Sequence, residues 1–379
     1  MKLFRKTKEG NQMPDITKSE ILNILKKVDD PNINNNLLTL NSIKEFKINN
    51  NVIDLSVTLP VSDSQINNAV KEKINGTLLK ELSSIKKINL QIQGKVTAHK
   101  DEKKDALLPG VKNTIAVASG KGGVGKSTVA VNIATALAKE GASVGLIDAD
   151  IYGPSIPLML GLKEKPKIYQ DKNTLKMIPL ENYGVKVISI GLLVDDNAPV
   201  IWRGPMASGA VKQFMSDVEW GELDYLIFDM PPGTGDIQLT LVQTVPLTGA
   251  VIVTTPQEIS LIDARKALKM FSRVNVPVLG VVENMSYFIA PDTGKHYDIF
   301  GTGGGSGLSR ELKVPFLGGM PIDPRIRIGG DKGVPIVYDV PGSDYEKAIL
   351  DISKNLAAQV ELRNTNPESG VEILLDNEE

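Results

Sequence analysis

The apolar residues in the N-terminal part of the chain switch between helical and strand-like spacing. A helix with one buried face is predicted first, because apolar residues recur every three or four positions. Its apolar positions are Ile21, Ile24, Leu25 and Val28. A strand follows at residues 53–59, where apolar and polar residues alternate. A second helix after Ser62 and a strand at residues 88–92 complete the order helix, strand, strand, helix, strand. Residues 14–98 are therefore predicted to form a small α+β adaptor domain.

The second region, residues 111–362, alternates short apolar strands with helical stretches. This pattern predicts an α/β fold, a doubly wound and mostly parallel sheet with helices on both faces. After an opening strand near residue 115, strands are predicted at 143–147, 185–190, 225–228, 250–254, 278–282 and 315–317. The charged stretch 99–110 is predicted to be a linker, and residues 363–379 a flexible acidic tail.

The opening strand of this domain runs into a glycine-rich loop. Residues 113–128 read NTIAVASGKGGVGKST, and Gly120, Gly125, Lys126 and Ser127 match the pattern G-x-x-x-x-G-K-[ST]. In such a loop, backbone N–H groups free of side-chain bulk converge on phosphate oxygens at a helix N-terminus. We expect Lys126 to reach the β- and γ-phosphates and Ser127 to ligate Mg²⁺. The alternative is a glycine-rich turn with a solvated lysine.

The nucleotide-binding stretch predicted from this loop consists of Gly120, Lys121, Gly122, Gly123, Val124, Gly125, Lys126, Ser127 and Thr128.

Carboxylates follow two of the predicted strands. Asp229 comes directly after the apolar residues 226–228, and Asp148 and Asp150 end the strand at 143–147. Ligands of open α/β sheets bind at the carboxyl ends of the strands. A carboxylate there can hold a water of the Mg²⁺ shell, because this small ion keeps several waters and takes few protein ligands. We predict that Asp229 holds such a water. The alternative for Asp229 is a helix N-cap, and the alternative for Asp148 and Asp150 is a pair of turn-forming aspartates.

Composition narrows the function classes. The 379 residues carry a formal net charge of -2, which gives no reason to expect nucleic acid or an anionic membrane as partner. The basic N-terminus lacks the apolar segment of a secretory signal and no stretch has the length of a membrane span, so a cytoplasmic location is expected. The chain has no cysteine, which excludes disulfides, thiolate-bound zinc and iron–sulfur clusters held by its own thiolates.

The glycine-rich loop, with its second lysine Lys121, resembles the deviant Walker A motif of the SIMIBI class, which includes MinD and ParA, the nitrogenase iron protein and the Mrp/ApbC group. The resemblance implies an ATP-hydrolysing homodimer in which Lys121 reaches the nucleotide of the second subunit. It also implies that Lys121, Lys126 and Asp150 are catalytic, with Asp150 orienting the attacking water, and that Asp148 supports Mg²⁺. Contacts to the adenine base are implied for Asn284, Pro321 and Asp323.

Four further stretches resemble the Mrp/ApbC ATPases in particular. They are IDADIYGPSIPLMLG at 147–161, MPPGTGD at 230–236, ENMSYF at 283–288 and GDKGVP at 330–335. Members of this group pass [4Fe-4S] clusters to apoproteins, and the cluster bridges two subunits through a C-P-x-C motif. The corresponding residues here are Ala290, Pro291, Asp292 and Thr293, so both thiolates are missing. Asp292, Thr293 and His296 are poor substitutes for soft thiolates.

The N-terminal region resembles, through the strand that ends Thr58-Leu59-Pro60, the small iron–sulfur-assembly domain found ahead of such ATPases. A plain docking module is the alternative for this region. For the whole chain, the expected function is that of an Mg²⁺-dependent ATPase in iron–sulfur cluster assembly, with apoprotein clients or assembly proteins as partners. Two alternatives remain open: an ATP-dependent partner switch or chaperone without a cluster, and a MinD/ParA-like positioning ATPase.

Overall fold

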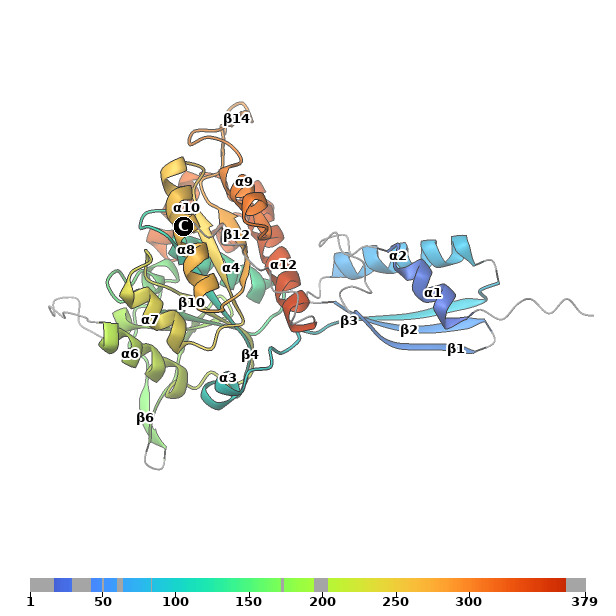
Figure 1. Cartoon of the computed structure of the whole chain (residues 1–379), viewed down its shortest axis with the longest axis horizontal. Helices are drawn as coiled ribbons and strands as arrows, with labels where there is room; N and C mark the ends of the chain where they lie inside the picture. The colour runs from blue at the N-terminus through green and yellow to red at the C-terminus, as the bar shows by residue number, and fades with distance from the viewer. Residues whose placement is uncertain are drawn as a thin grey trace, which may run out of the picture. The chain divides into compact units, whose positions relative to one another are not determined.

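The chain divides into two compact units, Met1–Lys95 and Val96–Glu379, which are described separately (Figure 1). The structure is a computed structural model that describes residues 17–28, 42–49, 51–59, 64–82, 84–171, 174–193 and 204–365. Predictions that concern other residues, such as the cap at Ser62 and most of the acidic tail, lie outside this described part.

The first unit packs two helices against one face of a three-stranded sheet, and its elements follow the predicted order of helix, strand, strand, helix and strand. Its elements are α1 (Lys18–Leu25), β1 (Ile43–Asn49), β2 (Val52–Leu59), α2 (Ser64–Glu81) and β3 (Lys87–Gly94). Strand β2 is central, antiparallel to β1 and parallel to β3. Every second residue of β2 is buried, and these side chains pack with those of α1 and α2. Thr17 and Glu20 form a capping box, in which the Thr17 N–H donates to Glu20 Oε2 at 2.9 Å.

The second unit is built on an eight-stranded sheet that is parallel except at one edge. In order across the sheet, its strands are β15 (Phe316–Gly319), β12 (Val278–Glu283), β11 (Gly249–Thr254), β4 (Val111–Ser119), β10 (Leu223–Asp229), β5 (Val144–Asp148), β9 (Val185–Ser189) and β8 (Leu180–Asn182). Only β8 runs antiparallel to its neighbour. Strands β11, β5 and β12 are buried along their whole length, and β10 at every residue except Asp224, because helices cover both faces of the sheet.

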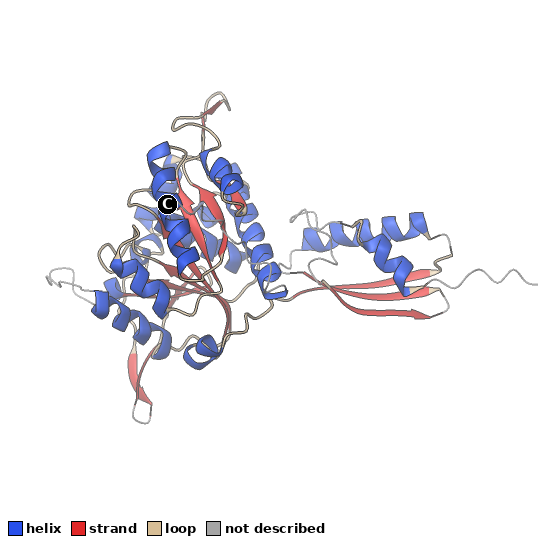
Figure 2. Cartoon of the chain, viewed as in Figure 1, coloured by secondary structure: helices blue, strands red, loops and turns tan. Residues whose placement is uncertain are grey.

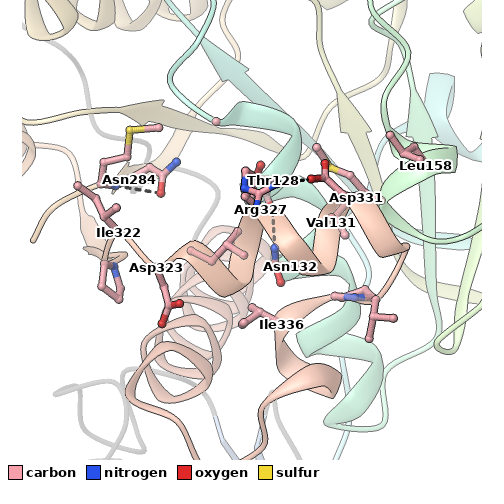
Figure 3. Close-up of a pocket in the computed structure, with 18 of the residues that line it drawn as sticks. Thr128, Val131, Asn132, Leu158, Asn284, Ile322, Asp323, Arg327, Asp331 and Ile336 are labelled. Atoms are coloured by element: carbon pink, nitrogen blue, oxygen red, sulfur yellow. Dashed lines mark hydrogen bonds and ion pairs between the residues drawn. The ribbon is translucent and has the colours of Figure 1, made fainter. Parts of the chain in front are cut away.

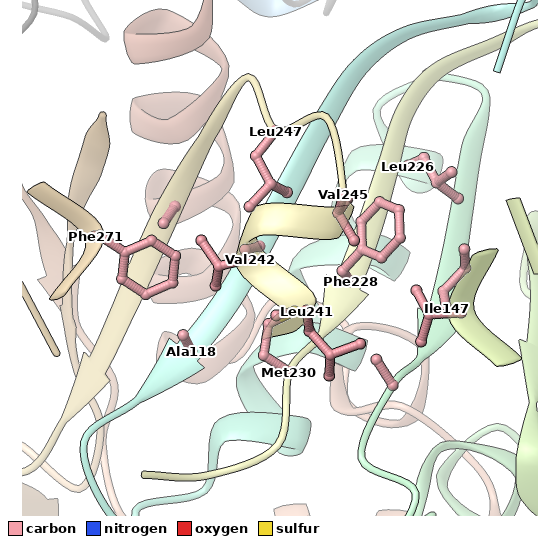
Figure 4. Packing of buried hydrophobic residues seen from close by; sticks show 14 of the residues in the cluster. Ala118, Ile147, Leu226, Phe228, Met230, Leu241, Val242, Val245, Leu247 and Phe271 are labelled. Carbon is pink, nitrogen blue, oxygen red and sulfur yellow. The ribbon is translucent and has the colours of Figure 1, made fainter. Parts of the chain in front are cut away.

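The helices of this unit lie in two layers, one on each side of the sheet (Figure 2). One layer contains α4 (Lys126–Lys139), α5 (Ile156–Met159), α10 (Pro324–Lys332), α11 (Ile336–Asp339) and α12 (Asp344–Thr365). The other contains α6 (Gly204–Ser216), α7 (Asp236–Thr244), α8 (Glu258–Arg273) and α9 (Gly304–Glu311). Between this second layer and the sheet lies an apolar core that includes Phe228, Leu241 and Phe271 (Figure 4).

Several short elements complete the second unit. They are α3 (Glu102–Leu107), β6 (Ile168–Asp171), β7 (Thr174–Met177), the 3-10 helix η1 (Ile190–Leu192), β13 (Phe288–Ile289) and β14 (His296–Tyr297). The pairs β6–β7 and β13–β14 are antiparallel hairpins outside the main sheet. No helix in the described ranges combines the length and apolar character that crossing a membrane requires.

The stretch predicted as a linker, 99–110, differs from expectation. It contains α3, and its Lys104 is buried, with Nζ donating to the carbonyl oxygen of Lys112 at 3.0 Å. Charged residues predict solvent exposure, so this packing could not be anticipated from the sequence. The aliphatic stem of a lysine can nevertheless be buried while its ammonium group donates hydrogen bonds to the backbone. His99, at the start of this stretch, is partly buried. These residues therefore belong to the second compact unit, whose α12 continues to Thr365.

Candidate functional site

The glycine-rich loop joins the end of β4 to the start of α4, as predicted. Gly123 and Gly125 have φ angles of +81° and +80°, which favour glycine. A Cβ at Gly125 would lie 2.2 Å from Nδ2 of Asn284, and one at Gly120 would lie 2.1 Å from the carbonyl oxygen of Asp263 in α8. Two of the motif glycines are thus required because other segments approach the loop closely.

Lys126, the first residue of α4, is held among carboxylates at the strand ends. Its Nζ lies 2.6 Å from Oδ1 of Asp229 and 3.5 Å from Oδ2 of Asp150. The same ammonium group donates to Oγ of Ser127 at 3.2 Å. Only 6% of the Lys126 side chain is exposed, so its charge acts in a medium of low polarity. This arrangement places a buried cation where the phosphate chain would meet the loop.

Asp148 and Asp229 occupy adjacent positions on the neighbouring strands β5 and β10. Asp148 accepts hydrogen bonds from Oγ of Ser189 at 2.9 Å and from the N–H of Asp150 at 3.2 Å. Burial, reinforced by the Asp229 carboxylate, raises the pKa of Asp148 to about 8. Burial also raises the pKa of Asp229, although Lys126 opposes that shift. Both carboxylates therefore favour a cation close to them.

The residues predicted to hold Mg²⁺ have the donor set for it. Oδ2 of Asp229 is buried and accepts no hydrogen bond from the described part of the chain. Ser127 supplies a hydroxyl oxygen beside Lys126. Oxygen donors in small number suit Mg²⁺, which keeps several water ligands. The oxygen donors of Ser127 and Asp229 therefore fit Mg²⁺.

Lys121, in the middle of the loop sequence, is partly exposed. Within the described residues its ammonium group makes no hydrogen bond or ion pair, while its carbonyl oxygen accepts from Oγ of Ser119 at 2.8 Å. The backbone of Lys121 is thus fixed and its side chain remains available. This placement differs from that of Lys126, whose ammonium group is buried among carboxylates.

A cavity of about 580 Å³ opens beside the loop (Figure 3). The predicted base-contacting residues Asn284, Pro321 and Asp323 all line it, together with Gly125 and Thr128 of the loop. In Figure 3 side chains of α4 and of α10 face one another across it. The cavity walls are mostly apolar with a few polar groups, and its size suits a nucleotide base and ribose.

The polar groups of Asn284 and Asp323 are already engaged. Nδ2 of Asn284 donates to the carbonyl oxygen of Val124 at 2.9 Å, and its Oδ1 accepts from the N–H of Met285 at 2.9 Å. Asp323 caps α10 by accepting from the N–H of Arg325 at 2.8 Å, and it also pairs with the Arg325 guanidinium group. The contacts of these two residues to adenine therefore stay predictions, whereas their place on the cavity wall is established.

Several cavity residues were not predicted from the sequence. They are Val131, Asn132, Leu158, Met159, Ile299, Phe300, Ile326, Arg327 and Asp331. They come from four separate segments that have no common motif. Of these residues, Leu158, Met159 and Asp331 lie in two stretches that carry the family resemblance, 147–161 and 330–335, but the sequence predicts no nucleotide contact for them.

The loop that replaces the C-P-x-C motif lies between β13 and β14. Ala290 is buried and Pro291, Asp292 and Thr293 are exposed. The ring of His296 stacks on Tyr287, with centroids 5.0 Å apart. In the part of the chain that the structure describes, no group of three or more His, Asp or Glu side chains has the arrangement of a metal site. The loop therefore does not fit an iron–sulfur cluster held by this chain's own side chains.

The parallel sheet, the loop at its centre and the carboxylates at the adjacent strand ends define a P-loop NTPase. A family model for the NUBPL iron-transfer P-loop NTPase matches residues 110–357, and one for an iron-sulfur cluster assembly protein matches residues 18–90. The chain therefore belongs to the NUBPL iron-transfer P-loop NTPase family, and the predicted resemblance of both domains is confirmed.

Relatives of similar length support this assignment. The chain is 47% identical over 349 residues to an iron-sulfur cluster carrier protein of Synechocystis, covering 92% of this chain and 99% of the relative. It is 43% identical over 347 residues to the iron-sulfur cluster carrier protein of Escherichia coli, covering 92% and 93%. Among solved structures, a nucleotide-binding protein of Archaeoglobus fulgidus in complex with ADP is 41% identical, with a TM-score of 0.54, covering 62% of this chain and 91% of that one.

Proposed function

We propose that this protein hydrolyses ATP with Mg²⁺ as a homodimer and uses the cycle to promote the assembly or transfer of iron–sulfur clusters to other proteins. The observation that carries the ATPase part is the buried contact of Lys126 with Asp229 and Asp150 at the start of α4. The similar Archaeoglobus protein binds ADP, and relatives over the whole length of the chain are named iron-sulfur cluster carriers.

In this proposal the residues of the phosphate loop and Asp150 have separate roles in ATP hydrolysis. Backbone N–H groups of 120–128 surround the phosphate oxygens, and Lys126 exchanges its carboxylate partners for the β- and γ-phosphates. Asp150, whose Oδ2 is 3.5 Å from Lys126 Nζ, orients the attacking water. Lys121, whose ammonium group is free within the described residues, contacts the nucleotide of the second subunit. Positioning and charge neutralisation are most of what phosphoryl transfer requires from a protein.

Mg²⁺, when bound by Ser127 and Asp229 with Asp148 in support, neutralises the charge that develops on the phosphate oxygens. The carboxylates have a structural role as well. Asp148 accepts three hydrogen bonds, from Oγ of Ser189 and from the N–H groups of Asp150 and Ile156, and thereby fixes the strand end from which Asp150 projects. Gly233, with a φ angle of +99°, allows the loop after Asp229 to change conformation during the cycle.

The iron–sulfur cluster is cargo in this proposal, and its thiolate ligands come from the proteins that deliver or receive it. The chain contains no cysteine, and the loop at 290–293 supplies a buried alanine and three exposed residues without a thiol. Cluster irons are held by soft sulfur ligands, for which aspartate and threonine are poor replacements. The N-terminal unit, which matches an iron–sulfur-assembly domain, would then dock the protein to those partners.

The same absence of cysteine favours a second candidate, an ATP-dependent partner switch that never contacts the cluster. It uses the same loop and the same homodimer, and it differs only in its cargo. Binding of assembly proteins would then depend on the nucleotide, and no iron would be found on this chain at any stage.

The experiment that tests the proposal measures cluster transfer without oxygen. A cluster-loaded assembly protein and a cysteine-containing apoprotein are mixed with this protein, with ATP or without nucleotide, and transfer is followed by visible absorption. Iron and acid-labile sulfide on the re-isolated chain are measured in parallel. We expect transfer to be faster with ATP and to stay at the background rate with the Lys126→Met variant. A rate that does not change with ATP would contradict the transfer function, and ATP-dependent complexes without faster transfer would favour the partner switch.

A further inference from the structure

A segment of the second unit, residues 286–305, leaves the sheet after β12 and returns at the start of α9; we refer to it as the arm. It contains the hairpin β13–β14 and the loop at 290–293. In Figure 1 the label β14 marks its outer end, away from the sheet. Residues 291–299 are all exposed. The outer half of the arm therefore has few packing contacts, and its position depends on how its ends are held.

Both ends of the arm are held by one side chain, that of Glu283. Oγ of Ser286 donates to Oε1 of Glu283 at 2.5 Å, and the N–H of Gly305 donates to Oε2 at 2.5 Å. Glu283 is 1% exposed, and its two side-chain oxygens accept from Ser286 and Gly305. Buried polar atoms need hydrogen-bond partners, so these two contacts fix both ends of the arm.

Close approach of the backbone explains why Gly304 and Gly305 stand where the arm returns to the sheet. A Cβ at Gly305 would lie 2.9 Å from Cβ of Glu283, and one at Gly304 would lie 2.6 Å from the carbonyl oxygen of Pro256. At the leaving end, a Cβ at Gly319 would lie 2.8 Å from Oγ of Ser286. The backbone therefore approaches Glu283 and Ser286 as closely as it does only because these positions lack side chains.

The same strand end also reaches the nucleotide cavity. Asn284, the next residue, donates to the carbonyl oxygen of Val124 in the phosphate loop. On the returning side of the arm, Ile299 and Phe300 line the cavity beside Asn284. Consecutive residues of β12 and its end thus hold the arm and the phosphate loop, and the arm itself supplies part of the cavity wall.

We propose that Glu283 is a positioning residue that couples nucleotide binding in the cavity to the position of the arm. A nucleotide that contacts Asn284, Ile299 and Phe300 shifts these residues and thereby changes the geometry of both hydrogen bonds of Glu283. The outer part of the arm then changes its position relative to the sheet. This inference rests on the proposed function, in which nucleotide-dependent changes govern what the protein presents to its partners.

The test compares Glu283→Leu, Glu283→Gln and the wild type. Leucine fills the space but removes both acceptors, whereas glutamine keeps an acceptor for Gly305 and a donor for Ser286. Glu258→Gln, a change at an exposed carboxylate of α8, is the matched control. Tryptic cleavage after the exposed Lys295 is followed by mass spectrometry with and without ADP. ADP affinity and the melting temperature are measured on the same samples.

In the wild type we expect ADP to slow cleavage after Lys295. In Glu283→Leu we expect cleavage to be about tenfold faster, ADP to give no protection, and ADP affinity to fall about tenfold, equivalent to 1.4 kcal/mol. Glu283→Gln and Glu258→Gln should match the wild type. A purely structural role would lower the melting temperature and leave protection by ADP intact.

Wild-type cleavage and protection in Glu283→Leu, or a wild type that ADP does not protect, would overturn the proposal. If Glu283→Leu does not fold, Ser286→Ala decides, because it removes one of the two hydrogen bonds; unchanged cleavage and protection would again overturn the proposal. This test can be told apart from a test of the proposed function. A protein that binds ADP but neither hydrolyses ATP nor promotes cluster transfer would still show whether ADP protects Lys295 from trypsin through Glu283.

Discussion

Replacing Lys126 by methionine is the most informative single change, because it separates the stability of the site from its use of nucleotide. Methionine keeps the apolar stem and removes the ammonium group. Asp229, fully buried, then loses a partner 2.6 Å away, and Asp150 loses one 3.5 Å away. Breaking a buried pair by removing one partner costs about 3–5 kcal/mol. For a unit of this size, that loss corresponds to a melting temperature lower by about 10 °C.

The loss of nucleotide affinity has a different origin. Lys126 donates charge-assisted hydrogen bonds to the phosphates in the proposed complex, each worth about 1.5–3 kcal/mol. We therefore expect ADP affinity to fall by about 10- to 100-fold or more. Thermal unfolding by circular dichroism gives the first quantity, and isothermal titration calorimetry with ADP gives the second.

A double variant and a control distinguish the two effects. In Lys126→Met with Asp229→Asn no uncompensated carboxylate is left at position 229, so we expect the melting temperature to recover most of its loss while ADP affinity stays low. Lys139→Met is the control, because Lys139 pairs with Glu346 at 2.5 Å and is not part of the phosphate loop. The reasoning fails if Lys126→Met is as stable as the wild type, or if the double variant binds ADP normally.

Three further changes test other parts of the site. Lys121→Ala should leave the melting temperature and ADP affinity unchanged and lower ATP turnover at least about tenfold, because its ammonium group has no partner among the described residues; steady-state hydrolysis measures this. Asn284→Ala should weaken ADP binding by about 1 kcal/mol in calorimetry, because its amide holds the carbonyl of Val124 at the cavity edge. Tyr345→Phe should leave the free energy of unfolding unchanged or raise it by up to about 1 kcal/mol in denaturant titration, since the buried hydroxyl accepts and donates no hydrogen bond in the described structure.

Each of these has a result that would contradict it. Normal turnover in Lys121→Ala would remove the argument for a lysine acting on a second subunit. Wild-type ADP affinity in Asn284→Ala would mean that the hydrogen bond from Asn284 to Val124 does not support the nucleotide site. A clear loss of stability in Tyr345→Phe would show that its hydroxyl has a partner in solution.

The local elements of this protein were largely predictable, because the apolar pattern reports directly on burial. The order of elements in the first unit and the principal parallel strands of the second were anticipated to within a few residues. The strands are buried on both faces, so they read as unbroken apolar runs bounded by glycine or aspartate. The short strands β6, β7 and β8 were not anticipated, since strands of three or four residues outside a buried core carry little pattern.

The phosphate loop and the three aspartates could be recognised from sequence because each is a short motif at a strand end. Parallel strands bring their carboxyl ends to one edge, so Asp148 and Asp229 had to meet once β5 and β10 were neighbours. The strand order decides that β5 and β10 are neighbours, and the local sequence does not contain that order. The burial of Lys126 and the raised pKa of Asp148 depend on it as well.

What the sequence determined by itself is the kind of chemistry, through residues whose function depends on near neighbours: the glycines and lysines of the loop, the strand-end aspartates and the complete absence of cysteine. The tertiary structure alone decided which distant segments share a cavity, that charged residues at 102–107 pack with the second unit, and that Glu283 holds both ends of the arm. The physical reason is that such contacts join residues far apart in the chain, and their energies arise from burial and approach distances that no local pattern encodes.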